Sequence, residues 1–138
     1  MALDALYQQA IIDHAKAAIG AGRLPGPTVS ATVDNPLCGD RVTVDLSLAD
    51  GKVAAIGHQV RGCLLCNAAA SVLARYAIGR DGPALRAVAQ GFEAMIRDGG
   101  PVPVDWPELE CFRPVHAAKS RHECVLLPFQ AAVKALEG

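Results

Sequence analysis

This sequence has few charged and aromatic residues and no long apolar run. Charged residues make up 20% of its 138 residues, aromatic residues 4%, and the net charge is -1. The longest stretch without a charge runs from Gly62 to Ala74, which is shorter than the roughly 20 apolar residues that a membrane-spanning helix needs. A nucleic-acid surface would show clustered Lys and Arg, and the sequence has no basic surplus. We therefore expect no membrane span and no nucleic-acid partner.

The N-terminus lacks the basic segment and apolar run of a secretory signal, so we expect a cytoplasmic protein. At this length, one domain that covers residues 1–138 is the default. In a reducing compartment, cysteines more often bind metal or take part in sulfur chemistry than form structural disulfides. The sequence has five cysteines, an odd number: Cys38, Cys63, Cys66, Cys111 and Cys124.

Hydrophobic periodicity predicts both helices and strands along the chain. Strict alternation over residues 41–48, followed by the turn formers Asp50-Gly51, predicts a β-hairpin that returns over residues 53–60. A further strand is expected just before it. The predicted strand covers residues 28–33, and the predicted helices cover residues 3–19, 63–78 and 83–97.

The C-terminal third is harder to assign. Residues 101–114 hold four prolines and predict an irregular segment, with a short helical turn from Pro107. Ser120 and Glu123 have the spacing of a capping box, in which each side chain bonds a backbone amide of the first helical turn. They predict the start of the last helix, in which Pro128 either introduces a kink or marks the true start.

Three of the cysteines stand at predicted chain reversals. Cys38 lies in a tight loop at one end of the hairpin, and Cys63 and Cys124 lie at helix starts. We expect these segments to converge, with Asp40 as a carboxylate that completes the set. Zinc takes four thiolate, imidazole or carboxylate ligands, and iron–sulfur clusters are held mainly by thiolates. The sequence therefore predicts a site for zinc, iron or an iron–sulfur cluster.

The charge of such a site needs compensation. Three thiolates and a carboxylate around a divalent metal leave about -2, so we expect a cation beside them. Arg121, one turn before Cys124, is the first candidate. Cys66 has three open readings: a ligand, a resolving thiol or a core residue. Cys111 is expected to be a core residue, because free cysteines are among the most buried side chains.

The pair Cys63 and Cys66 also supports an alternative from a different class. A Cys-x-x-Cys motif between a strand and a helix is typical of thioredoxin-like oxidoreductases. That fold needs a parallel strand crossover near the motif, whereas the preceding strands here form a hairpin. A zinc ribbon is less favoured still, because it needs a second Cys-x-x-Cys pair and the sequence has none.

The motifs together resemble a known family, the iron–sulfur cluster assembly scaffolds of the IscU, SufU and NifU N-terminal type. The resemblance covers nearly the whole chain and is strongest to the SufU branch, which carries an insertion similar to residues 99–119. The matching motifs are Asn35-Pro36-x-Cys38-Gly39-Asp40-Arg41, Gly62-Cys63 with Ala69-Ala70-Ser71, Arg121-x-x-Cys124-x-x-Leu127-Pro128-Phe129, and the first helix from Leu6 to Lys16.

This resemblance implies an α+β fold in which a small antiparallel sheet carries helices on one side. It implies that Cys38, Asp40, Cys63 and Cys124 bind zinc, iron or a [2Fe-2S] cluster. By analogy with the SufU branch, Cys38 would accept persulfide sulfur from a cysteine desulfurase, and downstream apo iron–sulfur proteins would receive the product. The protein would then be a scaffold without an enzymatic activity of its own, or a zinc-dependent sulfurtransferase that works with the desulfurase.

Overall fold

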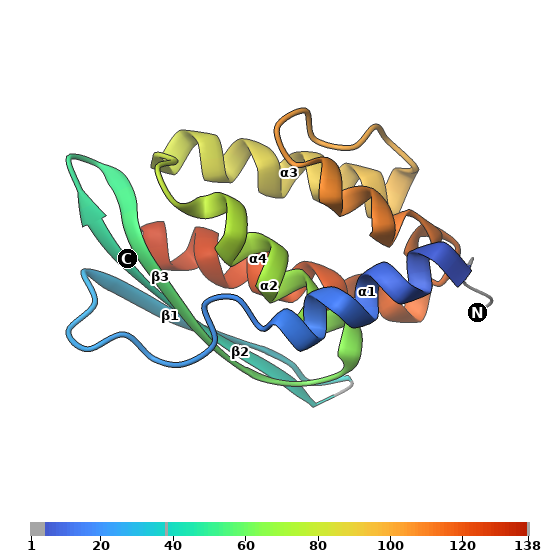
Figure 1. Ribbon diagram of the computed structural model, residues 1–138, viewed down its shortest axis with the longest axis horizontal. Helices are drawn as coiled ribbons and strands as arrows, with labels where there is room; N and C mark the ends of the chain where they lie inside the picture. The colour runs from blue at the N-terminus through green and yellow to red at the C-terminus, as the bar shows by residue number, and fades with distance from the viewer. Residues whose placement is uncertain (1–4, 38, 138) are drawn as a thin grey trace.

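Three antiparallel strands form one sheet in the order β1-β2-β3. The structure is a computed structural model, and it describes residues 5–37 and 39–137. The elements are α1 (Ala5–Ala17), β1 (Val29–Asn35), β2 (Asp40–Ala49), β3 (Lys52–Arg61), α2 (Leu64–Ala77), α3 (Gly82–Asp98), the 3-10 helices η1 (Pro107–Ala117) and η2 (Lys119–Arg121), and α4 (His122–Glu137). Figure 1 shows the helices gathered on one side of the sheet, which is the α+β arrangement that the family resemblance implies.

The alternation in β2 decides which face of the sheet is covered. Val42, Val44 and Leu46 are buried in the main hydrophobic core. Successive side chains of a strand point to opposite faces, so these three residues share the face that α4 covers. The turn Asp50-Gly51 joins β2 to β3 as expected, and both of its residues have positive φ, 55° and 76°.

The opposite face of the sheet is crossed by the segment between α1 and β1. Its anchor is Asp45 on β2, whose carboxylate accepts hydrogen bonds from Arg23 Nε at 2.6 Å, Ser30 Oγ at 2.5 Å and Leu24 N at 3.0 Å. Burial of Asp45 opposes ionisation, but these donors more than compensate and lower its pKa. The buried carboxylate therefore holds the crossing segment on the sheet.

The same segment is also fixed at the end of α1. His58 Nε2 bonds the carbonyl of Ile19 at 2.7 Å, and Ser71 Oγ accepts from the Ile19 amide at 3.1 Å. Gly20 allows the close approach, because a Cβ at this position would lie 2.6 Å from the Cβ of Ala74. Burial lowers the pKa of His58 below its ordinary value, against the effect of the Ile19 bond.

The proline-rich segment is more regular than its composition predicts. η1 extends over eleven residues, where the sequence indicates only a short turn. Its fully buried residues Leu109, Phe112 and Val115, each 0% exposed, recur every third position, which is the period of a 3-10 helix. Phe92 of α3 packs edge-on against Phe112, with ring centroids 5.7 Å apart. Period-three burial against α3 therefore orders this segment despite its prolines.

The last helix begins at His122, one residue after the start that Ser120 as the N-cap would give. Lys119–Arg121 form η2, and α4 starts at His122. Pro128 lies inside α4, which continues to Glu137, so this proline neither starts nor ends the helix. A proline has no N–H, so Pro128 cannot bond the carbonyl of Cys124 one turn earlier.

α3 lies in the outer layer, where it packs against α4 and η1.

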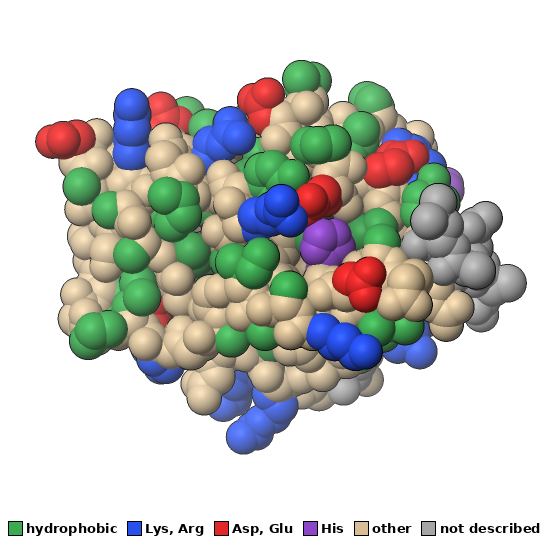
Figure 2. Space-filling view, viewed as in Figure 1, with side chains coloured by type: hydrophobic (Ala, Val, Ile, Leu, Met, Phe, Trp, Pro, Cys, Tyr) green, Lys and Arg blue, Asp and Glu red, His purple; other side chains and the backbone are tan. Residues whose placement is uncertain are grey.

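Both charge signs occur on the surface. Figure 2 shows Lys and Arg side chains along the lower edge of the visible face, where the sheet lies, and mixed charges over the helices. Among the helices in residues 5–37 and 39–137, none has both the length and the apolar character required to cross a membrane.

Candidate metal centre

Asp40, Cys63 and Cys124 come together at one end of the sheet. One ligand atom from each of them, a carboxylate oxygen or a sulfur, lies within 4.8 Å of the others. Asp40 is the first residue of β2, Cys63 immediately precedes α2, and Cys124 lies in the first turn of α4. These are three of the four positions that the sequence nominates as ligands. The fourth, Cys38, lies outside the described residues.

One oxygen of the Asp40 carboxylate lacks the partner that a buried carboxylate oxygen normally has. Asp40 is 6% exposed, and its Oδ2 has no hydrogen-bond partner within the described part of the chain. A buried oxygen without a partner costs about 1–3 kcal/mol or more. A cation bound between this oxygen and the two sulfurs removes that cost. Two thiolates and a carboxylate are donors that suit zinc and iron, so the residues present fit such a metal.

Cys63 is positioned by the start of α2. It is the N-cap residue, its side chain makes no capping hydrogen bond, and its carbonyl accepts from the side chain of Asn67 at 3.0 Å. The Sγ atom therefore does not cap the N-terminus of α2. The backbone amides at a helix N-terminus favour negative charge nearby, so α2 helps to stabilise an anionic ligand set.

Cys124 is held more deeply, at 2% exposed. The residue before it, Glu123, does not bond back to Ser120 as the capping-box prediction requires. Instead Arg97 Nη2 of α3 donates to Glu123 Oε1 at 2.6 Å. The hydrogen bond from Arg97 lowers the pKa of Glu123, with a smaller contribution from Gln130, although burial acts in the opposite direction. The capping box is therefore wrong, because a long-range partner takes its glutamate.

Arg121 lies beside the same cavity as Cys63. It is exposed and lines a cavity of about 730 Å³ together with Cys63 of α2 and Gln8 of α1. Lys119 lines the same cavity, so two cations lie on the η2 side of it. The sequence nominates Arg121 as the compensating charge. Its location next to the cavity beside Cys63 is compatible with that role.

Cys66 and Cys111 lie in the core. Cys66 is 0% exposed and belongs to the main hydrophobic cluster, one turn into α2. Cys111 of η1 is also buried, and burial raises its pKa to about 12, with a contribution from the neighbouring Glu108. The named strands are all antiparallel, without the crossover of a thioredoxin-like fold. The redox alternative for Cys63 and Cys66 therefore has no support.

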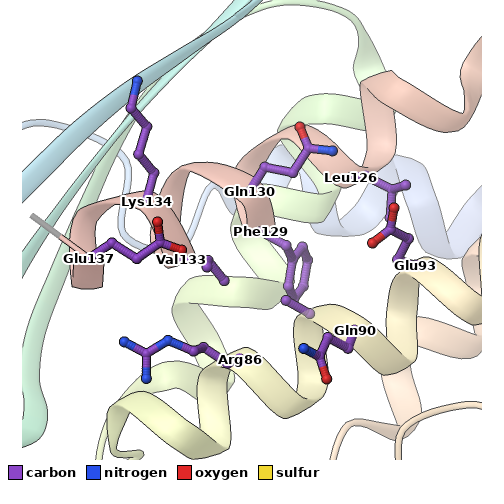
Figure 3. A pocket seen from close by; sticks show the side chains of 10 residues that line it. Arg86, Gln90, Glu93, Leu126, Phe129, Gln130, Val133, Lys134 and Glu137 are labelled. Atoms are coloured by element: carbon purple, nitrogen blue, oxygen red, sulfur yellow. The ribbon is translucent and has the colours of Figure 1, made fainter.

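A second hollow lies away from these residues. It has a volume of about 320 Å³ and lies between α3 and α4. Figure 3 shows Arg86, Gln90 and Glu93 from α3 and Phe129 and Lys134 from α4 around it. None of the three converging ligand residues lines it. We therefore place the candidate chemistry at the sheet end and not in this hollow.

Two residues at or near the site make contacts that the sequence does not reveal. Gly62 leaves room for the Asp40 carboxylate, because a Cβ at residue 62 would lie 3.0 Å from Asp40 Cγ. Arg97 reaches Glu123 from 26 positions away. The glycine before Cys63 is visible as part of a motif, but its contact becomes evident only from the fold. The Arg97 contact depends on how α3 packs against α4.

Known proteins resemble this chain in sequence and in structure. Residues 6–100 match the family described as NifU-like N terminal domain. The zinc-dependent sulfurtransferase SufU of Bacillus subtilis is 27% identical over 136 residues, which cover 96% of this chain and 90% of that protein. The iron–sulfur cluster assembly scaffold protein IscU of Streptococcus pyogenes is 26% identical, with 98% and 85% covered. A crystal structure of a NifU-like N-terminal protein from Brucella abortus superimposes with a TM-score of 0.90 at 36% identity, covering 95% of this chain and 92% of that one.

Proposed function

Because this chain belongs to the family of NifU-like N-terminal domains, we propose that it is a scaffold protein of iron–sulfur cluster assembly. The observation that carries this proposal is the convergence of Asp40, Cys63 and Cys124, whose ligand atoms lie within 4.8 Å of one another. We propose that Cys38 is the fourth ligand. Four ligands match the tetrahedral preference of zinc and the usual thiolate-rich ligation of iron–sulfur clusters.

The proposed ligand set limits the site to metals and clusters that accept thiolates. Zinc, iron and a [2Fe-2S] cluster are all accepted by thiolate-rich sites, so the metal present depends on its availability. When bound, the metal keeps the thiolates deprotonated and held together. The three thiolates and Asp40 carry a net charge of about -2 around a divalent ion. Arg121 and the N-terminus of α2 compensate this charge.

We also propose that the chain receives sulfur from a cysteine desulfurase. The thiolate of Cys38 attacks the outer sulfur of the enzyme's persulfide, a new sulfur–sulfur bond forms on Cys38, and the enzyme's cysteine leaves as a thiolate. The sulfur then passes, alone or within a cluster, to downstream apo iron–sulfur proteins. The similarity to a relative named as a zinc-dependent sulfurtransferase supports this step.

Two relatives with different named roles align over most of this chain. One is named as a cluster scaffold and the other as a zinc-dependent sulfurtransferase. We propose that residues 1–138 act as one domain in the cytoplasm and without an enzymatic activity beyond sulfur acceptance. In the proposal, a scaffold and a sulfurtransferase use the same four ligands. They differ in what is passed on, which is a cluster in the first case and sulfur alone in the second.

The proposed function is tested by desulfurase activity. Adding the protein to a cysteine desulfurase and cysteine should increase alanine production several-fold, and Cys38→Ser should remove this increase. Cys111→Ala is the matched control, since Cys111 is buried in the core, and it should stimulate like the wild type. Equal stimulation by Cys38→Ser and wild type would contradict sulfur acceptance at Cys38.

A further inference from the structure

The outer face of the sheet is polar, and the segment between α1 and β1 covers only part of it. Val42 and Val44 of β2 are buried in the core, so the alternate residues Arg41, Thr43 and Asp45 lie on the opposite face. The crossing segment is hydrogen-bonded to this face at Asp45. At the end that carries Arg41, all three strands present exposed side chains.

The strand register brings donor groups from all three strands together at this end. Arg41 is directly opposite Arg61 of β3, and Thr43 is opposite both Thr32 of β1 and Gln59 of β3. Opposite residues of neighbouring strands have Cβ atoms about 4.5–5.5 Å apart, which is within reach of long side chains. All of these residues line one cavity of about 370 Å³. Among the described residues that line it, none carries a carboxylate.

The two arginines form a like-charge pair that the fold compensates only in part. Like charges directly opposite each other in a sheet are destabilising. Arg41 Nε donates to Asp34 Oδ1 at 2.6 Å, and Asp34 is the register partner of Arg41 on β1. Within the described part of the chain, Arg61 has no carboxylate partner. The row of three residues across the sheet therefore carries a net positive charge.

A pair of threonines adds a neutral donor to the same cavity. Thr43 is 8% exposed, and its Oγ1 lies 2.8 Å from Oγ1 of Thr32. Each hydroxyl has one hydrogen and two lone pairs, so one hydroxyl donates to the other and the second hydrogen stays available. The side-chain amide of Gln59 offers two further N–H groups. An anion with several acceptor oxygens complements this set of donors.

We propose that this cavity is a binding site for a phosphate group. A phosphate monoester carries about -1.5 to -2 charges at pH 7 and three strongly accepting oxygens, so it matches two guanidinium groups and several neutral donors. Arginine binds phosphate through a planar fork of N–H groups. Arg61 is the main anchor, and Arg41 contributes its terminal nitrogens, because its bond to Asp34 uses Nε. The threonine pair and Gln59 donate to the remaining oxygens.

The phosphate site is separate from the proposed metal centre. Asp40, Cys63 and Cys124 do not line this cavity. The side chain of Asp40 is buried, and it lies on the face of β2 opposite to Arg41. The proposal therefore goes beyond the proposed function, and its test needs no bound metal.

The experiment follows the backbone amide NMR signals of the full chain during titrations at constant ionic strength. Inorganic phosphate and adenosine monophosphate should give saturable shifts that are largest at Thr43, Gln59 and Arg61. The tighter of the two phosphates identifies the source of the group, and equal affinities show that the phosphate group alone is recognised. Acetate, with one charge and two oxygens, should bind at least about tenfold more weakly. Shifts centred on Cys124, no saturation with either phosphate, or equal affinity for acetate would overturn the inference.

Three substitutions assign the donors. Arg61→Gln should weaken phosphate binding by at least about tenfold, because charge-assisted hydrogen bonds to phosphate are the stronger ones. Asp34→Asn should strengthen binding, because it releases Arg41 and removes a nearby negative charge. Thr43→Val leaves the charge unchanged and should weaken binding by about threefold or more through the lost hydroxyl. Unchanged affinity in Arg61→Gln would overturn the inference.

Two matched controls separate this cavity from the net charge of the protein. Arg86→Gln removes the same charge from an arginine that also has no carboxylate partner within the described residues, but that lines the hollow between α3 and α4. Asp105→Asn matches Asp34→Asn, since Asp105 pairs with Arg80 at 3.4 Å. Both controls should bind phosphate like the wild type. Losses of equal size in Arg86→Gln and Arg61→Gln would overturn the inference, because net charge would then explain the binding.

Discussion

The Asp40 carboxylate lies directly against the backbone of Gly62. A Cβ atom at residue 62 would be 3.0 Å from Asp40 Cγ and 3.1 Å from Asp40 Oδ1, which is closer than ordinary carbon contacts. The residue that precedes Cys63 is therefore also the residue that makes space for the neighbouring ligand. The strand that carries Asp40 and the segment that enters α2 approach one another here because no side chain separates them.

The first prediction concerns this contact. Gly62→Ala should lower the affinity for zinc or cobalt by about tenfold, because the added methyl group displaces Asp40 while metal–ligand distances tolerate only about 0.2 Å. Competition with a chromophoric chelator measures the change. Gly91→Ala on α3 is the control, since its new Cβ would come no closer than 3.4 Å to Pro103. Unchanged affinity in Gly62→Ala would show that the contact has no role in positioning Asp40.

The second prediction concerns the segment that crosses the sheet. Asp45→Asn removes the carboxylate charge that pairs with Arg23 and accepts a hydrogen bond from Ser30. This carboxylate is 0% exposed. We expect the free energy of unfolding to fall by about 1.5–3 kcal/mol, as for hydrogen bonds to charged groups. Urea denaturation measures it. Asp34→Asn is the comparison, because its pair with Arg41 is more than half exposed and should contribute at most about 1 kcal/mol. Equal losses in the two variants would contradict the prediction.

The third prediction concerns pH. Burial lowers the pKa of His58 below its ordinary value of 6.5, so the unfolded chain binds more protons than the folded chain as the pH falls below 6.5. The contribution of His58 to stability is therefore complete above this pH and decreases below it. Thermal unfolding of the metal-free protein between pH 7 and 5 should depend less on pH in His58→Asn than in wild type. Identical slopes would mean that His58 is not the titrating group.

The fourth prediction concerns thiol reactivity. Burial and the nearby Glu108 raise the pKa of Cys111 to about 12, so at pH 8 almost none of it is the reactive thiolate. Cys63 is partly exposed. After metal removal, iodoacetamide should therefore label Cys63 long before Cys111, as peptide mass spectrometry will show. In urea the two rates should become similar, and similar rates in the folded protein would contradict the structure.

Much of the fold follows from local sequence signals. The alternation in β2 and the Asp50-Gly51 turn predict the hairpin, because each depends on residues that are neighbours in the chain. Asp40, Cys63 and Cys124 are each recognised from a position next to a turn or a helix start. The structure brings these three residues together, while their role as ligands and the place of Cys38 stay predictions.

Other features depend on contacts that the sequence does not display. The capping box at Ser120 and Glu123 fails because Arg97, distant in sequence, is a stronger partner for the glutamate than a backbone amide. The sequence underestimates the length of η1 because its prolines indicate irregular structure. Burial of Leu109 and Phe112 instead stabilises a 3-10 helix. Both errors arise where tertiary packing overrides local preference.

The most direct test of the account is the metal content of the purified protein and its ligand variants, measured by elemental analysis after dialysis. We expect about one zinc or iron site per chain in wild type and in Cys111→Ala, and loss of most metal in Asp40→Ala, Cys63→Ala and Cys124→Ala. Circular dichroism establishes that each variant is folded. Full metal content in a folded Cys63→Ala protein would contradict the assignment of this site.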